Sequence, residues 1–546
     1  MAQVELESAT AQTGGGDTEQ QVAAVPGIAR AATLIALGNV ASRVLGLARE
    51  TVIADLFAAS GLVSAFDVAG RLPRMLFDLL IDGLVSSALV PVFSELAERD
   101  RAELWRVASI MISLATVVMS VGVLLLELFA PQAAWLMAGG FDPDLLAYTA
   151  WLMRITTPAV VFLSLSGIIT GLLYALRRFT LPAFTAAVFN ACIVGVALVL
   201  TGMLGWGVES LALGLLVGSF MQVALQLPGL RGASLRFSLD WHHPELRRIA
   251  RLYAPVVLGL VISQVGIVID RNLASRTGEQ SIAWMRYATT LVQFPLGLVS
   301  VAISMAILPT LSRLASPSHS ASLEGFMDTL AVGLKMVLVL ILPAVVGLFV
   351  LSEPVVALVF QHGAFTAFDT GQTALALRIY LLGTTFAAVD LPLVYAFYAR
   401  KNTLTPALVG VLGVGLYLAA ALTPILFRDL RMTDLVLANS IQLTGHALVM
   451  LWLMHRVGSL RGRGLEQLAL KSLAASLVMG GVTLGLAQWL VSLLPGQALL
   501  NELVVVGGSG LVGLAVYVAL VMLLRIQEVG LFLALLRRQF GKLGGK

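Results

Sequence analysis

Apolar runs long enough to cross a lipid bilayer recur along nearly the whole chain, and they constrain its fold more than any other feature. A helix of about twenty predominantly apolar residues spans the roughly 30 Å of hydrocarbon in a bilayer. Of the 546 residues, 58% are hydrophobic and only 12% are charged, whereas a soluble domain carries about 25% charged residues. Lipid must therefore be the solvent for most of the chain, and we predict an all-α polytopic membrane protein.

We predict about 14 transmembrane helices, with approximate ends. Pro and Gly occur inside several of them, which membrane helices tolerate better than soluble ones. The predicted spans lie near residues 30–57, 65–93, 107–130, 147–175, 181–203, 207–229, 249–274, 282–311, 330–352, 371–398, 404–427, 433–455, 467–491 and 499–524.

Positive charge alternates between successive loops. Cytoplasmic loops carry an excess of Lys and Arg, so the basic loops are predicted to face the cytoplasm. Both termini then lie in the cytoplasm, which requires an even number of spans. The basic set includes Arg99, Arg101, Arg106, Arg177, Arg178, Arg247, Arg248, Arg400, Lys401, Arg461 and Arg463, and the opposite set holds only Arg276, Arg428 and Arg431.

The two halves of the chain resemble each other. Pro91 and Pro309 occupy matching positions in similar segments, and Arg154 and Arg378 match at nearly the same separation along the chain. A near-constant offset indicates an internal duplication. Each copy covers six spans, so the repeat is parallel, and transporters built from parallel repeats place the substrate site between the two halves. A duplication without moving parts is the alternative.

The duplication divides the chain into predicted regions. Residues 465–525 hold two further helices outside the repeat. The full division is a disordered cytoplasmic tail over 1–27, an N-lobe over 28–230 (helices 1–6), a C-lobe over 245–456 (helices 7–12), helices 13–14 over 465–525, and a basic cytoplasmic tail over 526–546.

Charged residues inside the predicted spans point to a polar site. A charge at the bilayer centre costs about 2.5–3.5 kcal/mol on insertion scales, so these side chains must line a wet cavity or pair with each other. Guanidinium groups bind phosphate oxygens bidentately, and the arginines are predicted to form a cationic chamber for a phosphate-bearing substrate. Structural ion pairs and side chains that reach the interface are the alternative. The charges are Arg43, Arg49, Glu50, Asp55, Asp67, Arg71, Arg74, Asp78, Asp82, Asp270, Arg271 and Arg286, with Arg378 and Asp390 in the tenth span.

The segment Ser42–Glu50 (SRVLGLARE) resembles the first-helix motif of the MurJ (MviN) family of lipid II flippases, within the multidrug/oligosaccharidyl-lipid/polysaccharide exporter (MOP) superfamily. The resemblance continues in order along nearly the whole chain after the N-terminal tail. It is carried by Leu72-Pro73, Asp82-Gly83, Val90-Pro91, Arg178-Phe179, Pro182–Phe184, Ser263-Gln264, Trp284-Met285, Phe294-Pro295, Leu308-Pro309, Phe360-Gln361, Gly363, Phe365–Asp369 and Phe397–Arg400.

The resemblance implies two six-helix lobes and two C-terminal helices that form a lipid-binding groove. It implies a flippase that exports the undecaprenyl-pyrophosphate-linked peptidoglycan precursor, lipid II, from the cytoplasmic to the periplasmic leaflet of the bacterial inner membrane by alternating access. Arg43 and Arg49 fall on family arginines needed for function. The expected partners are lipid II or a related polyprenyl-pyrophosphate glycan, membrane lipids and the cell-wall synthesis machinery.

Three family positions differ in this chain. The second-helix arginine falls on Phe77, an acidic residue falls on Ser64, and an Asp-Arg pair falls on Thr289-Thr290. Arg74, Arg271 and Arg286 are predicted to replace the missing cations in substrate binding. Glu50, Asp82, which stands where the family has Glu, and Asp270 are candidates for gating or ion coupling.

Other functions remain as alternatives. A flippase for another polyprenyl-linked glycan shares the same features, and a drug/cation antiporter of the same superfamily would favour a net acidic cavity and about twelve spans. A membrane enzyme would need catalytic carboxylates in a sizeable outward loop, and a scaffold would not need buried arginines. We expect no enzyme activity.

No cofactor is expected. The single cysteine, Cys192, excludes an internal disulfide, and the six histidines have no metal-ligand spacing. The sequence has no Walker motif, so the membrane potential or an unassigned coupling cation must drive transport. The net charge of +4 gives no support for nucleic-acid binding.

Overall fold

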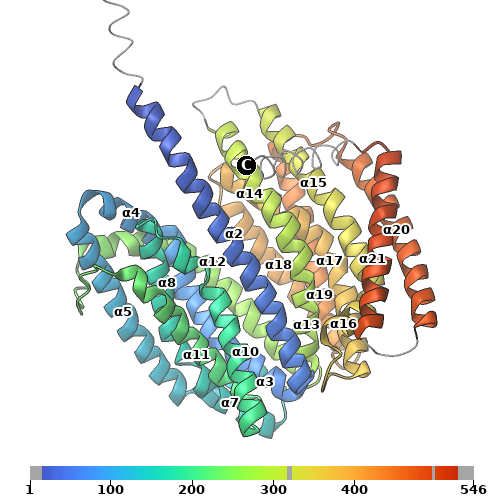
Figure 1. Ribbon diagram of the computed structural model, residues 1–546, viewed down its shortest axis with the longest axis horizontal. Helices are drawn as coiled ribbons and strands as arrows, with labels where there is room; N and C mark the ends of the chain where they lie inside the picture. Colours follow the sequence, from blue (N-terminus) through green and yellow to red (C-terminus); the bar gives the residue numbers. More distant parts are fainter. Residues whose placement is uncertain (1–14, 317–322, 495–498, 527–546) are drawn as a thin grey trace, which may run out of the picture. The chain divides into compact units, whose positions relative to one another are not determined.

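The computed structural model describes residues 15–316, 323–494 and 499–526, and every regular element in these ranges is helical (Figure 1). This agrees with the predicted all-α class. The α-helices are α2 (Gly15–Phe57), α3 (Gly61–Phe77), α4 (Val90–Arg99), α5 (Arg101–Leu128), α6 (Ala130–Ala138), α7 (Pro143–Thr156), α8 (Ala159–Ala175), α9 (Thr180–Ala183), α10 (Thr185–Leu204), α11 (Glu209–Gln226), α12 (Pro244–Ser275), α13 (Ser281–Pro295), α14 (Val301–Leu314), α15 (Leu323–Val350), α16 (Ser352–Phe360), α17 (Ala367–Ala399), α18 (Leu404–Leu422), α19 (Met432–Val457), α20 (Leu465–Leu493) and α21 (Leu499–Leu523).

Within these described ranges, ten helical segments are long and apolar enough to span a membrane, and the bent pair α7–α8 makes eleven. The predicted count of 14 is reached by adding α2, the run from α3 to α4, and α12. These three segments are less uniformly apolar, and they carry Arg43, Arg49, Arg74 and Arg271. The least apolar predicted spans are thus the ones that hold most of the candidate site.

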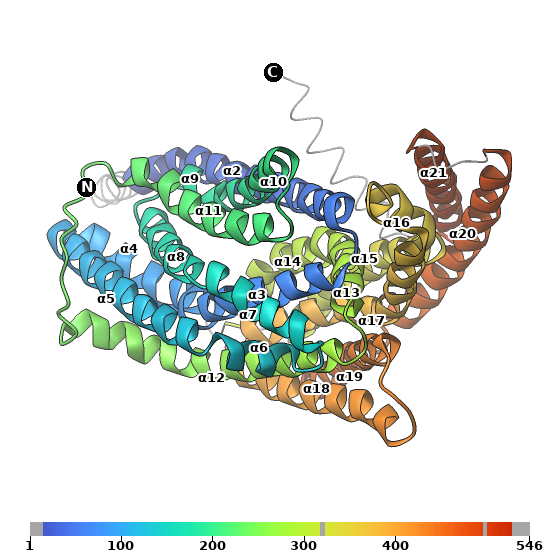
Figure 2. The same ribbon diagram turned by 90° about the horizontal axis from the view of Figure 1, so that it is seen from below.

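The chain separates into two compact units. Unit 1 comprises residues 1–52, 65–134 and 144–265. Within it, α8 packs against α5 and α11, and α11 packs against α10, an order that can be followed in Figure 2. The hydrophobic core of unit 1 gathers side chains of α4, α5, α8 and the first half of α12, among them Phe93 and Leu104.

Unit 2 comprises residues 53–64, 135–143 and 266–546. Its longest helix, α17, packs against α13, α15 and α19, and α19 packs against α18. A core around Phe326, Leu393 and Met450 joins α14, α15, α17 and α19. The last two described helices, α20 and α21, lie side by side at one edge of this unit and contact α15 and α16 (Figures 1 and 2).

Helix lengths support the internal duplication. Helices α5 and α15 each contain 28 residues. The helices that follow them, α6 and α16, each contain nine residues. The packing order α5, α8, α11, α10 in unit 1 matches the order α15, α17, α19, α18 in unit 2. The repeat therefore extends from sequence to helix length and helix packing.

Backbone irregularities recur at corresponding positions of the two halves. A π-helical turn at Asp78–Asp82 precedes α4, and its counterpart at Leu296–Ser300 precedes α14. Arg177, after α8, and Lys401, after α17, both adopt a φ of +58°, a value that non-glycine residues seldom take. Local departures from regular helix at matching positions indicate that the two halves share the same backbone conformation.

The two halves also differ at one point. Where α17 is continuous, the corresponding span of unit 1 is broken into α7 and α8, which are bent by 40°. Pro158 lies at the break and supplies no backbone N–H, so the helical hydrogen-bond ladder is interrupted there. The predicted single span over 147–175 is thus a pair of helices.

The termini are described only in part. Helix α2 begins at Gly15, so residues 15–27, which the sequence assigns to a disordered tail, are helical here. Residues 1–14 and 527–546 lie outside the described ranges, and so does nearly all of the predicted basic C-terminal tail.

Candidate functional site

The first-helix motif of unit 1 is held by one residue of α10. Arg49 donates from Nε and Nη2 to Oε1 of Glu50, at 3.1 and 2.6 Å, and from Nη1 to Oδ1 of Asn190, at 2.9 Å. Asn190 in turn donates from Nδ2 to the carbonyl oxygen of Ser42 at 3.2 Å. Glu50 and Asn190 are 2% and 8% exposed. This small network fixes the motif to α10 and pairs the charges of Arg49 and Glu50 with each other.

Arg49 retains binding capacity in this network. A guanidinium has five N–H donors, and the contacts above use three of them. The side chain of Arg49 is 27% exposed, so it is accessible from one side. Arg43, earlier on the same helix, is exposed. The two arginines predicted as substrate ligands therefore differ in burial, since Arg49 is partly buried and Arg43 is exposed.

Arg74 is paired along its own chain segment. Its Nε donates to Oδ1 of Asp78, four residues further along the chain, at 2.9 Å, and its guanidinium lies over the ring of Phe77 at 5.6 Å. The Arg74 side chain is 58% exposed. Because Asp78–Asp82 is a π-helical turn, the angular spacing beyond Asp78 differs from that of a regular α-helix. The side chain of Asp82 lies outside the described part of the structure.

The candidate charges of unit 2 lie beside tyrosines. The Tyr417 hydroxyl of α18 donates to Oδ1 of Asp270 at 2.5 Å. Asp270 and Arg271 both act electrostatically on Tyr380 of α17. Asp270 is thus bonded to a side chain of another helix, while Arg271 points about 100° away from it around α12.

Arg286 lies on α13, partly buried, with its guanidinium 5.9 Å from the centre of the Tyr287 ring. The hydroxyls of Thr289 and Thr290, which stand where the family has an Asp-Arg pair, both donate to the Arg286 carbonyl oxygen at 3.0 Å. Such bonds back to the preceding turn satisfy the threonine hydroxyls within the helix. The two threonines therefore fill the position without supplying charge.

One close contact between a histidine and a carboxylate was not predicted. Nδ1 of His446 on α19 lies 3.0 Å from Oδ1 of Asp390 on α17, and the two side chains are 18% and 19% exposed. Asp390 could be recognised in the sequence as a charge within a span, but its partner lies on a different helix. The spacing of the histidines alone gave no reason to select His446.

Several residues of the family motif form a structural cluster at one end of unit 2. Thr366 caps α17 in a capping box with Asp369, and Asp369 also accepts a hydrogen bond from Nε1 of Trp284 at 2.8 Å. Ser64, at the position of a family acid, accepts from the backbone N–H of Ala283 in the first turn of α13 at 3.2 Å. These motif residues supply hydrogen-bond acceptors for backbone N–H groups at the starts of α17 and α13.

Gly363 in the same cluster has a φ of +52° and lies against the backbone of Asp55; a Cβ atom there would stand 2.4 Å from the Asp55 carbonyl oxygen. The adjacent Ala364 N–H donates to that oxygen at 2.8 Å. Only glycine combines this backbone angle with this close approach.

No group of three or more His, Cys, Asp or Glu side chains suited to a metal ion occurs within residues 15–316, 323–494 and 499–526. The candidate site consists instead of arginines, single carboxylates and tyrosine hydroxyls. Such groups bind anions, transfer protons or hold a loosely coordinated monovalent cation.

Comparisons with known proteins place this arrangement in context. A family model described as "Lipid II flippase MurJ" matches residues 53–503. "Probable lipid II flippase MurJ" of Vibrio cholerae serotype O1 is 32% identical over 387 residues, which cover 68% of this chain and 73% of that protein. "Lipid II flippase MurJ" of Burkholderia cenocepacia is 29% identical over 486 residues, which cover 80% and 92%.

Solved structures share the fold. A lipid II flippase MurJ in an inward closed conformation aligns with a TM-score of 0.76 at 24% identity and covers 91% of this chain and 100% of that one. An inward-facing multidrug resistance MATE family transporter of the MOP superfamily aligns with a TM-score of 0.63 at 14% identity, over 77% of this chain and 95% of that one. At these identities the likeness concerns the fold alone.

Proposed function

The chain belongs to the lipid II flippase MurJ family, and from this premise we propose that it moves lipid II from the cytoplasmic to the periplasmic leaflet of the bacterial inner membrane. The observation that carries the proposal is the family match over residues 53–503. The multi-pass helical fold supports it. Because lipid II is the precursor of peptidoglycan, the protein would serve cell-wall synthesis and cell shape.

The charged helices give the proposal a physical basis. The headgroup of lipid II is polar and carries a pyrophosphate, so it cannot cross hydrocarbon unaided, whereas its polyprenyl tail can stay in the lipid. We propose that Arg43, Arg49 and Arg74 of unit 1 and Arg271 and Arg286 of unit 2 contact the headgroup. Guanidinium groups keep their charge and match phosphate geometry. The partial exposure of Arg49 and Arg74 supports such a role.

The duplicated halves support a mechanism of alternating access. Transporters made of parallel repeats move one half against the other around a central site. A bound pyrophosphate can shift such an equilibrium only through different affinities for the two states. In the proposed cycle, the arginines bind the substrate more tightly in the inward-open state. The substrate is released when the protein changes to the outward-open state.

Transport against a gradient needs a source of free energy. The sequence has no Walker motif, so we propose that the membrane potential or a coupling cation supplies it. One charge that crosses the membrane field gains about 2.3 kcal/mol per 100 mV. Glu50, Asp82 and Asp270 are the proposed gating or ion-coupling residues, and the contact between Asp270 and Tyr417 ties one of them to a neighbouring helix.

The alternatives carry less support. A likeness to MATE transporters at 14% identity speaks for a common fold and not for drug export. We propose no catalysed covalent reaction, since the family is one of flippases. The cell-wall synthesis machinery remains a proposed partner, and both termini are proposed to lie in the cytoplasm.

The function is tested by complementation. Cells depleted of their own lipid II flippase are supplied with this chain, and lipid II accessible on the periplasmic face is measured. The expected result is restored growth and restored lipid II exposure. Growth without a return of exposed lipid II, or no complementation by a chain that reaches the membrane at normal abundance, would contradict the proposal.

Arg271→Ala tests the predicted replacement of the missing family cations. The variant is expected to abolish lipid II exposure while the protein remains folded in the membrane. Arg276→Ala is the matched control, because Arg276 is exposed and lies just beyond the end of the same helix. Normal flipping by Arg271→Ala would remove this arginine from the proposed site.

A further inference from the structure

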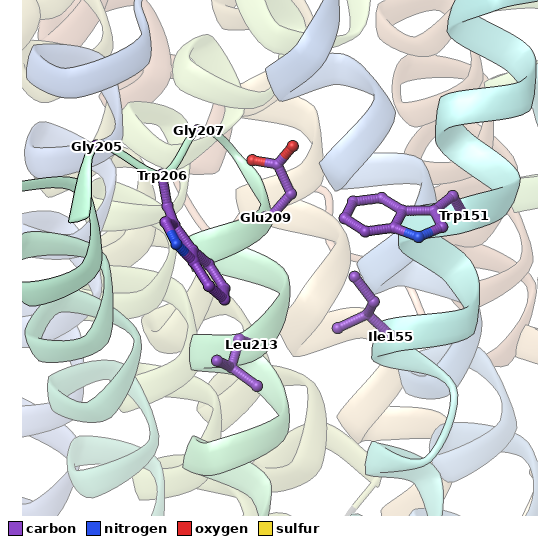
Figure 3. A pocket seen from close by; sticks show the side chains of 7 residues that line it. All are labelled: Trp151, Ile155, Gly205, Trp206, Gly207, Glu209 and Leu213. Carbon is purple, nitrogen blue, oxygen red and sulfur yellow. The ribbon is translucent and has the colours of Figure 1, made fainter.

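Unit 1 contains a cavity that the proposed transport cycle does not use. It has a volume of about 610 Å³ and opens beside the short connection between α10 and α11 (Figure 3). Figure 3 shows the indoles of Trp151 and Trp206 on opposite sides, with the Glu209 carboxylate between them. The lining residues are Trp151, Ile155, Gly205, Trp206, Gly207, Glu209 and Leu213.

The cavity carries a negative charge that no lining cation offsets. Glu209 is the first residue of α11, where the helix dipole and the unsatisfied backbone N–H groups attract acidic side chains. The Tyr148 side chain lies near enough to interact with it electrostatically. Among the described residues that line the cavity there is no Lys, Arg or His. A cationic group is the natural complement to this carboxylate.

The two indoles suit an organic cation better than a metal ion. Trp151 and Trp206 are each 43% exposed, so both ring systems are partly open to the cavity and the surroundings. Tryptophan gives the strongest cation–π attraction among the aromatic residues. Tryptophans are also common at membrane interfaces in general, but that preference does not account for a carboxylate set between two of them.

The surroundings of the cavity indicate lipid. At the end of α10, next to the cavity, Met203 and Leu204 are 79% and 62% exposed. Exposed apolar side chains on a membrane helix face acyl chains. The alternation of loop charges predicts that the α10–α11 connection lies on the outer side of the membrane. If a lipid headgroup lies in the cavity, the acyl chains of that lipid would run along the end of α10.

We propose that this cavity binds the primary ammonium headgroup of an aminophospholipid from the outer leaflet. The ammonium would lie against the Glu209 carboxylate and between the faces of Trp151 and Trp206. The acyl chains would extend along Met203 and Leu204. An anionic lipid of similar size lacks the cation and would meet the negative carboxylate, so the site discriminates by headgroup charge.

Binding of defined lipids to the purified full-length protein tests the proposal. The probes are phosphatidylethanolamine, its N-acetylated form, which has no positive charge, and phosphatidylglycerol, each titrated into the detergent-solubilised protein and followed by native mass spectrometry. We expect phosphatidylethanolamine to bind about tenfold more tightly than the other two, from the combined ion-pair and cation–π attraction. Equal affinity for all three lipids would overturn the proposal.

Variants assign the effect to the cavity. Glu209→Gln keeps the shape of the side chain and removes its charge, and it is expected to abolish the preference for phosphatidylethanolamine. Trp206→Leu, in the exposed connection, should weaken that preference severalfold even if Glu209→Gln disturbs the start of α11. Glu279→Gln, at an exposed carboxylate outside the cavity, is the matched control and should bind as the unaltered protein does. An unchanged preference in both cavity variants would refute the site.

A soluble amine could offer the same chemistry as a lipid headgroup. Glycerophosphoethanolamine, which has the same headgroup and no acyl chains, separates the two sources. The proposal expects it to bind far more weakly than phosphatidylethanolamine, because the contacts with exposed apolar side chains are lost. Equal binding of the two probes would show that the cavity takes a free amine and would overturn the lipid assignment.

Discussion

Arg49 illustrates how a partly buried cation is kept in place. Its guanidinium bonds to Glu50 on the same helix and to Asn190 on α10, and Asn190 also holds the Ser42 carbonyl. The motif in the sequence identifies Arg49 and Glu50 as candidates. Asn190 is not part of that motif, so its role becomes visible only once α2 and α10 are in contact.

Arg49→Lys preserves the positive charge and is predicted to impair function. A lysine ammonium is a compact charge that cannot bond to Glu50 and Asn190 in the same fork geometry. We expect lipid II exposure in the complementation assay to fall by at least about tenfold. Arg101→Lys, at an exposed arginine at the start of α5, should have no effect. Full activity of Arg49→Lys would show that charge alone is required at this position.

His446 and Asp390 form a second pair of residues whose significance depends on the tertiary structure. The two side chains are largely buried, with Nδ1 and Oδ1 3.0 Å apart between α19 and α17. Removal of one member of a buried pair leaves a polar group without its compensating partner, which is more costly than the loss of both.

A double-mutant cycle tests this coupling. Asp390→Ala and His446→Ala are each expected to lower the free energy of unfolding by about 3 kcal/mol, and the double variant by clearly less than the sum. Unfolding in mixed detergent micelles provides the measurement. Strictly additive effects of the two substitutions would mean that the residues do not stabilise each other.

Helix contacts in unit 2 depend on small residues at particular crossings. Helices α17 and α19 approach so closely at Gly383 that a Cβ atom there would lie 2.7 Å from Cα of Ser440. The Ser440 hydroxyl donates to the carbonyl of Ile379 at 2.7 Å across the same crossing. Small residues at a membrane helix interface permit this approach and the hydrogen bond that accompanies it.

Two glycine substitutions on α17 are predicted to have opposite effects. Gly383→Ala should lower the melting temperature, because the clash is with a backbone atom that cannot rotate away, at a cost of about 1–3 kcal/mol. Gly371→Ala should be neutral or stabilising by about 0.5–1 kcal/mol, since alanine favours helix and no atom lies within 4 Å of its Cβ. If both variants melt alike, the crossing is not sensitive to the size of residue 383.

At the scale of the whole molecule, the duplication sets the organisation of the chain. Helix lengths, packing order and two backbone irregularities recur between unit 1 and unit 2 at a near-constant separation along the sequence. An even number of spans in each copy requires that both copies enter the membrane from the same side. The side of the membrane on which each loop lies can therefore be tested directly.

Membrane-impermeant labelling is predicted to distinguish two loops. With the single native cysteine removed by Cys192→Ala, a cysteine introduced as Glu279→Cys should react in spheroplasts. A cysteine introduced as Ser459→Cys should react only after the membrane is permeabilised, because its loop carries the cytoplasmic arginines. Both positions are exposed in the structure. The reverse pattern would invert the proposed topology.

Sequence alone determined the class of fold, the family and the duplication. These follow from local hydropathy, from short motifs and from a near-constant offset, all of which act along the chain. The hydropathy pattern also located the predicted spans, but it did not reveal the break between α7 and α8 or the start of α2 at Gly15.

Tertiary structure decided the partners of the charges. Asn190 beside Arg49, Tyr417 beside Asp270 and His446 beside Asp390 all come from other helices, far from their partners along the chain. The rotation of each helix about its axis and the closeness of each crossing determine these contacts. Both depend on side-chain packing across the whole unit, whereas the apolar pattern that forms each helix is complete within about twenty residues.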